Sequence, residues 1–297
     1  MAERNRVNLR VNFRSPVKAR LGQNFLTNQS AAEDIVDALG DVSSSVVVEI
    51  GPGRGALTET LVKRAGRVIA IELDRKLAAE LRLAYSDQPN LEVLEGDVLT
   101  IDFRAVLRPS GPLIALRPPQ TQRAHLLGNL PYYITSDILL RLFEFHDQFD
   151  RMVIMVQREV ADRIAAKPGS RDYGLLSATA QLYTKAEKLF TLPPGAFSPP
   201  PQVHSTVLRL TVAPRFEELA VPPKEFIDFL KRAFGMKRKT LVNNLKPYFS
   251  PEKIKAALER AGVRADVRAE AISLEKSAEI FRRLHRVEEP NQNLFGR

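Results

Sequence analysis

Short apolar runs recur through the first two thirds of the chain and alternate with stretches of helical periodicity. The runs lie at 46–50, 68–71, 91–95, 124–127, 152–156 and 203–210. Runs of β-branched and aliphatic residues are typical of strands buried inside an α/β sheet. The stretches between them place apolar residues on one face of a helix. The pattern therefore predicts an α/β fold in which helices cover a central sheet.

The pattern changes after residue 213, where apolar residues recur only at helical spacing. Three amphipathic helices are predicted there, and prolines break the chain between the first two. We therefore expect a flexible basic arm at 1–20, an α/β domain at 21–213 and a small all-helical domain at 214–297.

The composition favours a soluble protein with a polyanionic partner. The chain of 297 residues contains no Cys, and it has no apolar run of about 18 residues that could span a membrane. Its net charge of +9 comes from the two ends, 1–20 and 213–297, whereas the segment between them is close to neutral. Basic ends can clamp phosphates, although a solvated basic surface is the alternative. The start shows no apolar secretory leader, so we expect a cytoplasmic protein.

A glycine-rich turn, G-P-G-R-G at 51–55, follows the first strand directly and leads into a predicted helix. Glycines at such a turn let the backbone approach a ligand and present free N–H groups at the helix start. The spacing differs from the G-x-G-x-x-G pattern of dinucleotide binding, which disfavours a nicotinamide oxidoreductase.

Acidic side chains follow the next two strands. Glu72 comes about twenty residues after the glycines, where a carboxylate can accept hydrogen bonds from ribose hydroxyls. Asp97 follows the third strand, where it can accept from an adenine amino group; taken alone, it would be a helix cap. The four His residues have no ligand spacing and there is no Cys, so we expect no metal site.

The fourth strand leads into Asn129-Leu130-Pro131-Tyr132. An exocyclic amine of a nucleobase is a poor nucleophile, and acceptors such as the Asn129 oxygen and the Leu130 carbonyl can grip its N–H groups. Tyr132 offers a flat face on which a base can stack. The hypothesis is methylation of a nucleobase amino group, and the alternative is an ordinary strand-to-turn segment with a buried tyrosine.

A proline-rich segment at 192–203 carries a single aromatic residue, Phe197. We expect a rigid loop without regular hydrogen bonding there, because its five prolines cannot donate backbone N–H groups. Phe197 could stack on the target base opposite Tyr132, or it could pack back into the core.

Together these motifs resemble the KsgA-type ribosomal RNA adenine dimethyltransferases. The matching motifs are GQNFL at 22–26, VEIGPG at 48–53, IELD at 71–74, GD at 96–97, GNLPY at 128–132, FSPPPQV at 197–203, RKTL at 238–241 and NNL at 243–245. The chain departs from the family pattern at Leu21, Tyr133 and His204, where an aromatic, an Asn and an acidic residue are frequent.

The resemblance implies a Rossmann-like, S-adenosylmethionine-dependent methyltransferase sheet and no metal. It implies cofactor contacts at Asn24, Leu26, Gly51, Glu72, Asp97 and Asn129. Asn129 and the Leu130 carbonyl would hold N6 of the target, while Tyr132 and Phe197 would stack on its two faces. The domain at 21–213 would be catalytic and the helical domain at 214–297 would bind RNA.

The implied activity is transfer of methyl groups to N6 of two adjacent adenines, in the 3′-terminal hairpin loop of 16S ribosomal RNA. The implied partner is this RNA within a small-subunit assembly intermediate, with no membrane involved, and we expect a monomer that acts in ribosome biogenesis. Three alternatives stay open: an Erm-type enzyme acting on 23S ribosomal RNA, a cofactor-binding ribosome-assembly factor, and a DNA amino-methyltransferase. The segment after 238 favours the KsgA type over the Erm type.

Overall fold

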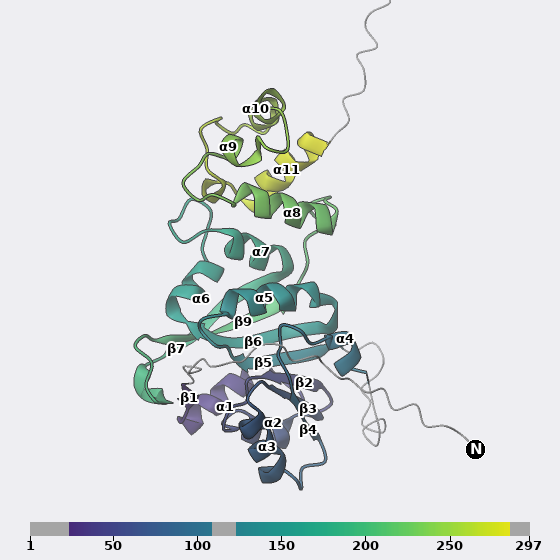
Figure 1. The fold of residues 1–297 in the computed structure, drawn as a ribbon, viewed down its shortest axis with the longest axis vertical. Coiled ribbons are helices and arrows are strands. Elements are labelled where there is room, and N and C mark those ends of the chain that lie inside the picture. The colour runs from purple at the N-terminus through teal and green to yellow at the C-terminus, as the bar shows by residue number, and fades with distance from the viewer. Residues whose placement is uncertain (1–23, 109–122, 286–297) are drawn as a thin grey trace, which may run out of the picture.

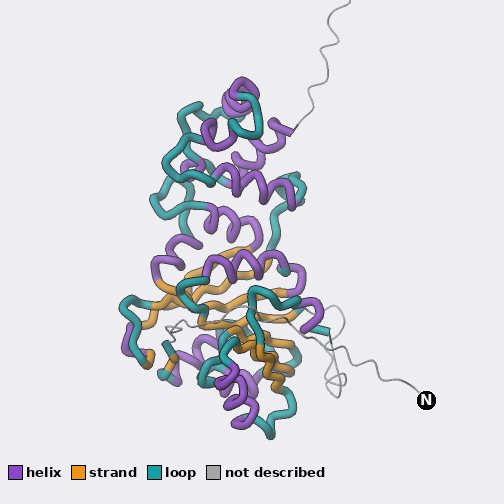
Figure 2. The backbone as a smooth tube through the Cα atoms, viewed as in Figure 1, coloured by secondary structure: helices purple, strands orange, loops and turns teal. Residues whose placement is uncertain are grey.

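The computed structural model describes residues 24–108 and 123–285. In these residues an α/β part and an all-helical part follow one another along the long axis of the molecule (Figures 1 and 2). The basic arm expected at 1–20 lies outside the described residues, and so do Gly22 and Gln23 of the first motif.

A seven-stranded sheet forms the centre of the α/β part, in the order β4-β3-β2-β5-β6-β9-β7. The strands are β2 (Val46–Ile50), β3 (Arg67–Glu72), β4 (Leu91–Glu95), β5 (Ala124–Asn129), β6 (Phe149–Gln157), β7 (Thr184–Leu192) and β9 (Ser205–Val212). The strands from β4 to β6 in this order are parallel, and β9 is antiparallel to both of its neighbours. The predicted α/β fold is confirmed, with all six predicted strands in the sheet.

The strand order of the sheet reverses between β2 and β5. β3 and β4 extend the sheet on one side of β2, whereas β5 and β6 extend it on the other. Ile50, at the end of β2, pairs with Ile71 on one side and with Gly128 on the other. Open α/β sheets bind their ligands at the carboxyl ends of strands at such a point. The residues that follow β2, β3 and β5 therefore meet at one edge.

Helices cover both faces of the sheet. They are α1 (Gln29–Asp37), α2 (Thr58–Arg64), α3 (Arg75–Ala84), α4 (Phe103–Val106), α5 (Thr135–Glu144), η2 (His146–Gln148), α6 (Arg158–Ile164) and α7 (Leu175–Tyr183). Figure 1 shows α1, α2 and α3 on one side of the sheet and α5, α6 and α7 on the other. Because side chains alternate along a strand, neighbours on β2 face different cores. Val47 belongs to the same apolar cluster as Leu61 of α2, and Val48 belongs to the other cluster, with Ile138 of α5.

Side-chain caps fix where several helices begin. Asp74 accepts hydrogen bonds from Lys76 N and Leu77 N at the start of α3, at 2.8 and 3.3 Å. Asn28 caps α1 by accepting from Ala31 N at 2.9 Å. A capping oxygen of this kind satisfies an N–H group that has no partner within the helix. The α3 cap also fixes the turn that follows Glu72.

The all-helical part comprises α8 (Pro223–Ala233), α9 (Leu241–Leu245), α10 (Pro251–Arg260), η4 (Ala269–Ala271) and α11 (Leu274–His285). The ring of Phe281 packs edge-on against Phe226 and Phe229, with centroids 5.3 and 5.6 Å apart. These rings belong to the same continuous apolar core as α5 and α7, so α7 joins the helical part to the sheet. The domain boundary proposed at 213/214 falls between β9 and α8.

The proline-rich segment differs from its expected structure. It contains a short helical turn, η3 (Pro194–Ala196), and a two-residue strand, β8 (Phe197–Ser198). β8 pairs antiparallel with β1 (Phe25–Leu26), which places Leu26 opposite Phe197. The expectation of a loop without regular hydrogen bonding was therefore wrong, because a distant segment supplies the partners.

We predict that Asn244→Ala destabilises the helical part, because this buried side chain closes the end of α8. Its Nδ2 donates to the carbonyls of Ala233 and Met236, at 2.7 and 3.2 Å. Loss of a buried donor leaves both carbonyls short of a partner, at a cost of about 1–3 kcal/mol. Urea unfolding of the whole chain measures this change.

The neighbouring Asn243 is the matched control, because it is exposed and its amide bonds only Thr240 among the described residues. Asn243→Ala should change the free energy of unfolding by less than about 0.5 kcal/mol. Equal effects of the two substitutions would contradict the role of Asn244.

Candidate active site

The glycine-rich turn between β2 and α2 forms one wall of a pocket at the switch point of the sheet. Gly51 and Gly53 have φ values of +65° and +58°, which side chains rarely adopt. A Cβ atom on Gly53 would also lie 3.0 Å from the ring of Phe25. Only glycine at position 53 thus leaves the turn its shape and keeps Phe25 against it.

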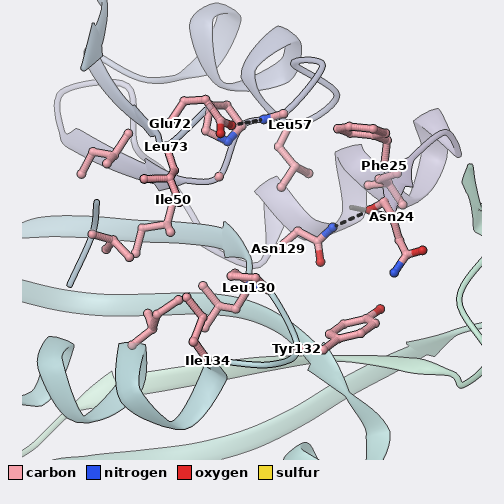
Figure 3. Close-up of a pocket in the computed structure, with 18 of the residues that line it drawn as sticks. Asn24, Phe25, Ile50, Leu57, Glu72, Leu73, Asn129, Leu130, Tyr132 and Ile134 are labelled. Carbon is pink, nitrogen blue, oxygen red and sulfur yellow. Dashed lines mark hydrogen bonds between the residues drawn. The ribbon is translucent and has the colours of Figure 1, made fainter. Parts of the chain in front are cut away.

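The carboxylate of Glu72 holds this turn in place from the end of β3. Its Oε2 accepts from Gly53 N at 3.0 Å and its Oε1 accepts from Asp74 N at 2.9 Å. The side chain is 3% exposed. Glu72 therefore ties two strand-end turns together, at the edge of the pocket that it lines (Figure 3).

Glu49 is a second carboxylate behind the same turn, and it is buried. Its Oε2 accepts a hydrogen bond from Thr58 Oγ1 at 2.7 Å, whereas its Oε1 has no hydrogen-bond partner among the described residues. Burial raises the pKa of Glu49 to about 7, the Thr58 bond lowers it in part, and the charge of Glu72 raises it further. A proton on this carboxyl therefore stabilises the fold near neutral pH.

Asn129 ends β5 and is held by a residue far away in the sequence. Its Nδ2 donates to the carbonyl oxygen of Asn24 at 3.1 Å. Because the nitrogen is used in this bond, the side-chain oxygen points away from Asn24, on the side of Tyr132 (Figure 3). The amide therefore presents an acceptor to the pocket.

The residues after Asn129 form a tight turn. Leu130 N donates to the carbonyl of Met155 on β6 at 3.0 Å, and the Leu130 side chain is buried. The carbonyl of Pro131 accepts from Ile134 N at 3.3 Å and from Thr135 Oγ1 at 2.9 Å. These bonds fix the backbone on both sides of the two tyrosines, Tyr132 and Tyr133.

The phenol of Tyr132 is anchored by β9. Its hydroxyl and Ser205 Oγ are 2.8 Å apart. Burial raises the pKa of Tyr132, while the bond to Ser205 lowers it in part. Tyr132 thus stays neutral at physiological pH and holds its ring in one orientation.

The structure brings most of the predicted site residues together. One pocket is lined by Asn24, Leu26, Gly51, Glu72, Asp97, Asn129, Leu130 and Tyr132, together with parts of the glycine-rich turn. Asp97 also accepts from Leu99 N at 2.9 Å, which fixes the turn after β4.

Phe197 is placed differently from the other predicted residues. It is 3% exposed, lies in an apolar cluster with Leu26 and Val207, and does not line the pocket. Its backbone nevertheless pairs with Leu26, which does line the pocket. The stacking role of Phe197 stays a prediction.

Sequence reasoning missed Ser205 and the carbonyl of Asn24, which orient Tyr132 and Asn129. Neither has a local sequence signal, because a backbone carbonyl is common to all residues and Ser205 reaches Tyr132 only through pairing of β9 with β6. Arg54 was also missed; its guanidinium lies 4.5 Å from the centre of the Phe25 ring at the pocket wall.

Residues 24–108 and 123–285 contain no group of three or more His, Cys, Asp or Glu side chains that could hold a metal ion. Within the same residues, no helix has the length and apolar character needed to cross a bilayer.

Comparison with known proteins gives consistent matches over most of the chain. The family model described as "Ribosomal RNA adenine dimethylase" matches residues 14–286. The chain is 58% identical to ribosomal RNA small subunit methyltransferase A of Koribacter versatilis (strain Ellin345), over 93% of this chain and 97% of that protein. It is 53% identical to the protein of the same description from Acidobacterium capsulatum, over 90% of this chain and 91% of that one.

Two solved structures share the fold. A dimethyladenosine transferase from Plasmodium falciparum aligns with a TM-score of 0.69 and 26% identity, over 86% of this chain and 95% of that one. The 23S rRNA methyltransferase ErmE aligns with a TM-score of 0.62 and 25% identity, over 89% of this chain and all of that one.

We predict that Glu49 makes the stability of the protein depend on pH. With a folded pKa of about 7 against an ordinary glutamate pKa of 4.5, the folded protein holds a proton that the unfolded chain has released. Stability therefore falls as pH rises from about 4.5 to about 7, by up to about 3 kcal/mol, and is flat above that range. Glu49→Gln removes this dependence.

Urea unfolding at pH 5 and pH 8 measures the effect. From pH 5 to pH 8 the unmodified protein should lose stability through Glu49, whereas the Glu49→Gln variant should not. The variant should therefore gain stability relative to the unmodified protein over this pH range. Glu80→Gln, on the exposed surface of α3, is the control and should follow the unmodified protein. Parallel pH dependence of all three proteins would show that Glu49 is ionised at pH 5.

Proposed function

Since this chain belongs to the ribosomal RNA adenine dimethylase family, we propose that it transfers methyl groups from S-adenosylmethionine to N6 of two adjacent adenines in the 3′-terminal hairpin loop of 16S ribosomal RNA. The chain is an rRNA adenine dimethyltransferase with a Rossmann-like fold. The two similar relatives carry the description of small-subunit methyltransferases, whereas ErmE, a 23S enzyme, is 25% identical. This difference supports a small-subunit substrate. We propose that this substrate is an assembly intermediate of the small subunit and that the protein acts on it as a monomer.

The residues that line the pocket fit S-adenosylmethionine in donor set. Gly51 and Gly53 line the pocket with bare backbone directly after β2, where a Cβ on Gly53 would meet the ring of Phe25. We assign the Glu72 carboxylate to the ribose hydroxyls and Asp97 to the adenine amino group, with Asn24 and Leu26 closing the opposite wall. When bound, the cofactor supplies an electrophilic methyl group on a sulfonium centre.

The orientation of the Asn129 amide is the observation that carries this function. Its nitrogen is occupied by the Asn24 carbonyl, so its oxygen is the atom presented toward Tyr132. In our proposal this oxygen and the Leu130 carbonyl accept the two N–H groups of the target amine. Two acceptors placed in this way direct the nitrogen lone pair toward the methyl donor.

Tyr132 supplies the stacking face for the target adenine. Ser205 holds its hydroxyl, so the ring does not have to be ordered when the base arrives. Phe197 is our candidate for the second face, and to reach the base its side chain must leave the apolar cluster that it shares with Leu26. Extraction of an adenine from its stack agrees with an RNA hairpin loop as substrate.

We assign the two carboxylates that line the pocket, Glu72 and Asp97, to the cofactor, so neither is left to act as a general base toward the target amine. The pKa of Tyr132 is raised by burial, so its hydroxyl is protonated at neutral pH. We propose that the amine loses its proton to water after the methyl group has been transferred. The chain then contributes orientation and exclusion of water, not proton transfer.

We propose that the basic segment after α8 contacts RNA phosphates. Lys237, Arg238 and Lys239 are all exposed, and Lys231 and Arg232 lie on the last turn of α8. Their charge agrees with an RNA partner, because Lys and Arg supply the sequence-independent part of RNA affinity. The helical part would thus hold the RNA while the pocket takes the adenine.

We predict that Asn129→Ala lowers single-turnover methyl transfer by at least about 100-fold, since one positioned hydrogen-bonding group is lost from the reacting centre. The free energy of unfolding should change by less than about 1 kcal/mol, because Asn129 is only partly buried. Transfer to a 16S hairpin and thermal unfolding are measured in parallel, with Asn243→Ala as the control. A variant that transfers methyl groups within three-fold of the unmodified rate would exclude this role of Asn129.

We predict that reversing two charges, Lys237→Glu and Arg238→Glu, weakens RNA binding and flattens its salt dependence. Each lost phosphate contact should reduce the slope of log K against log salt by about one. Lys63→Glu with Lys76→Glu is the control, because α2 and α3 lie across the sheet from the helical part (Figure 1). If both double variants have the same slope, the segment after α8 does not contact RNA.

A further inference from the structure

Tyr133 is exposed at the pocket although it carries a large aromatic ring. Five large apolar side chains of the described residues are exposed, and Tyr133 has an exposed fraction of 62%. It is the only one of the five among the residues that line the pocket. An aromatic ring left in water at a binding site gains free energy when a flat partner covers it.

The two neighbouring tyrosines have different surroundings. Tyr132 is partly buried and its hydroxyl is bound to Ser205. Within residues 24–108 and 123–285, the side chain of Tyr133 has neither a hydrogen bond nor a ring contact. Tyr133 therefore has no structural partner in this part of the chain that would explain an aromatic residue at this position.

One turn fixes the backbone of both tyrosines. The bond from Ile134 N to the Pro131 carbonyl closes a four-residue turn, and Tyr132 and Tyr133 are its two central residues. Thr135 Oγ1 adds a second bond to the same carbonyl. The position of Tyr133 relative to the base that stacks on Tyr132 is thus set by a short, braced piece of backbone.

We propose that Tyr133 is the stacking platform for the nucleotide next to the target adenine. This inference rests on the proposed function, in which the target has an adjacent adenine. Extraction of one base costs that base its stacking contact with its neighbour, and an exposed aromatic ring at the rim replaces the contact for the base that stays outside. Tyr133 then makes the site prefer a target that is followed or preceded by a second base, and it keeps that second adenine beside the pocket.

The test compares RNA binding by the full chain in the presence of S-adenosylhomocysteine. Three 16S-type hairpins are used: one with both adenines, and two in which one or the other adenine is replaced by an abasic residue. Tyr133→Ala should weaken binding of the intact hairpin about 5- to 150-fold, the range for one base–aromatic stack. The loss should shrink to less than two-fold on the abasic hairpin that lacks the stacked neighbour.

Two variants separate stacking from other effects. Tyr133→Phe should bind each hairpin within two-fold of the unmodified protein, because the hydroxyl has no partner among the described residues. Tyr248→Ala removes an exposed tyrosine on the helical part, which has 51% of its surface exposed and lies under Arg232. It should change binding of all three hairpins by the same factor.

The possible results are distinct. Equal losses for Tyr133→Ala on all three hairpins, or no loss on any, would overturn the inference while methylation by the unmodified protein upholds the proposed function. If the unmodified protein neither binds nor methylates the intact hairpin, the proposed function fails and the inference fails with it.

Discussion

The site depends on one hydrogen bond between distant parts of the chain. An Asn amide can present either its oxygen or its nitrogen, and the bond from Asn129 Nδ2 to the Asn24 carbonyl decides between them. The reaction that we propose needs an acceptor, because the target amine has only N–H groups to offer there. The segment around Asn24 is in turn held by pairing of β1 with β8. The acceptor that faces the target therefore rests on contacts between residues more than a hundred positions apart.

Buried carboxylates support the opposite side of the pocket. Glu72 accepts two backbone N–H groups, whereas Glu49 accepts one hydroxyl and leaves an oxygen without a partner among the described residues. A buried carboxyl with an unmet oxygen lowers stability when it is ionised. A local loss of stability of this kind is common next to functional turns, where the shape of the backbone matters more than local stability.

The local pattern of the sequence predicted the sheet and most of the pocket. Strand runs and the glycine-rich turn are local signals, and parallel strands bring their carboxyl ends together, so Glu72, Asp97 and Asn129 were expected to meet. β7 was missed because it is an edge strand with charged residues at 185, 187 and 188, which hides its alternation. Ser205 and the strand pair of Phe25 with Ser198 depend on long-range pairing that no local pattern encodes. Phe197 was expected either to face the base or to pack into the core, and in this structure its side chain is in the core.

The most direct test of the proposed function is to identify the bases that receive the methyl group. The protein is incubated with labelled S-adenosylmethionine and small-subunit particles that lack the modification, with free large-subunit RNA in a parallel reaction, and the labelled bases are mapped. The proposed function predicts N6,N6-dimethyladenine at two adjacent positions of the 3′-terminal hairpin of 16S ribosomal RNA. Label confined to large-subunit RNA, or no label in either RNA from a protein that binds the cofactor, would contradict it.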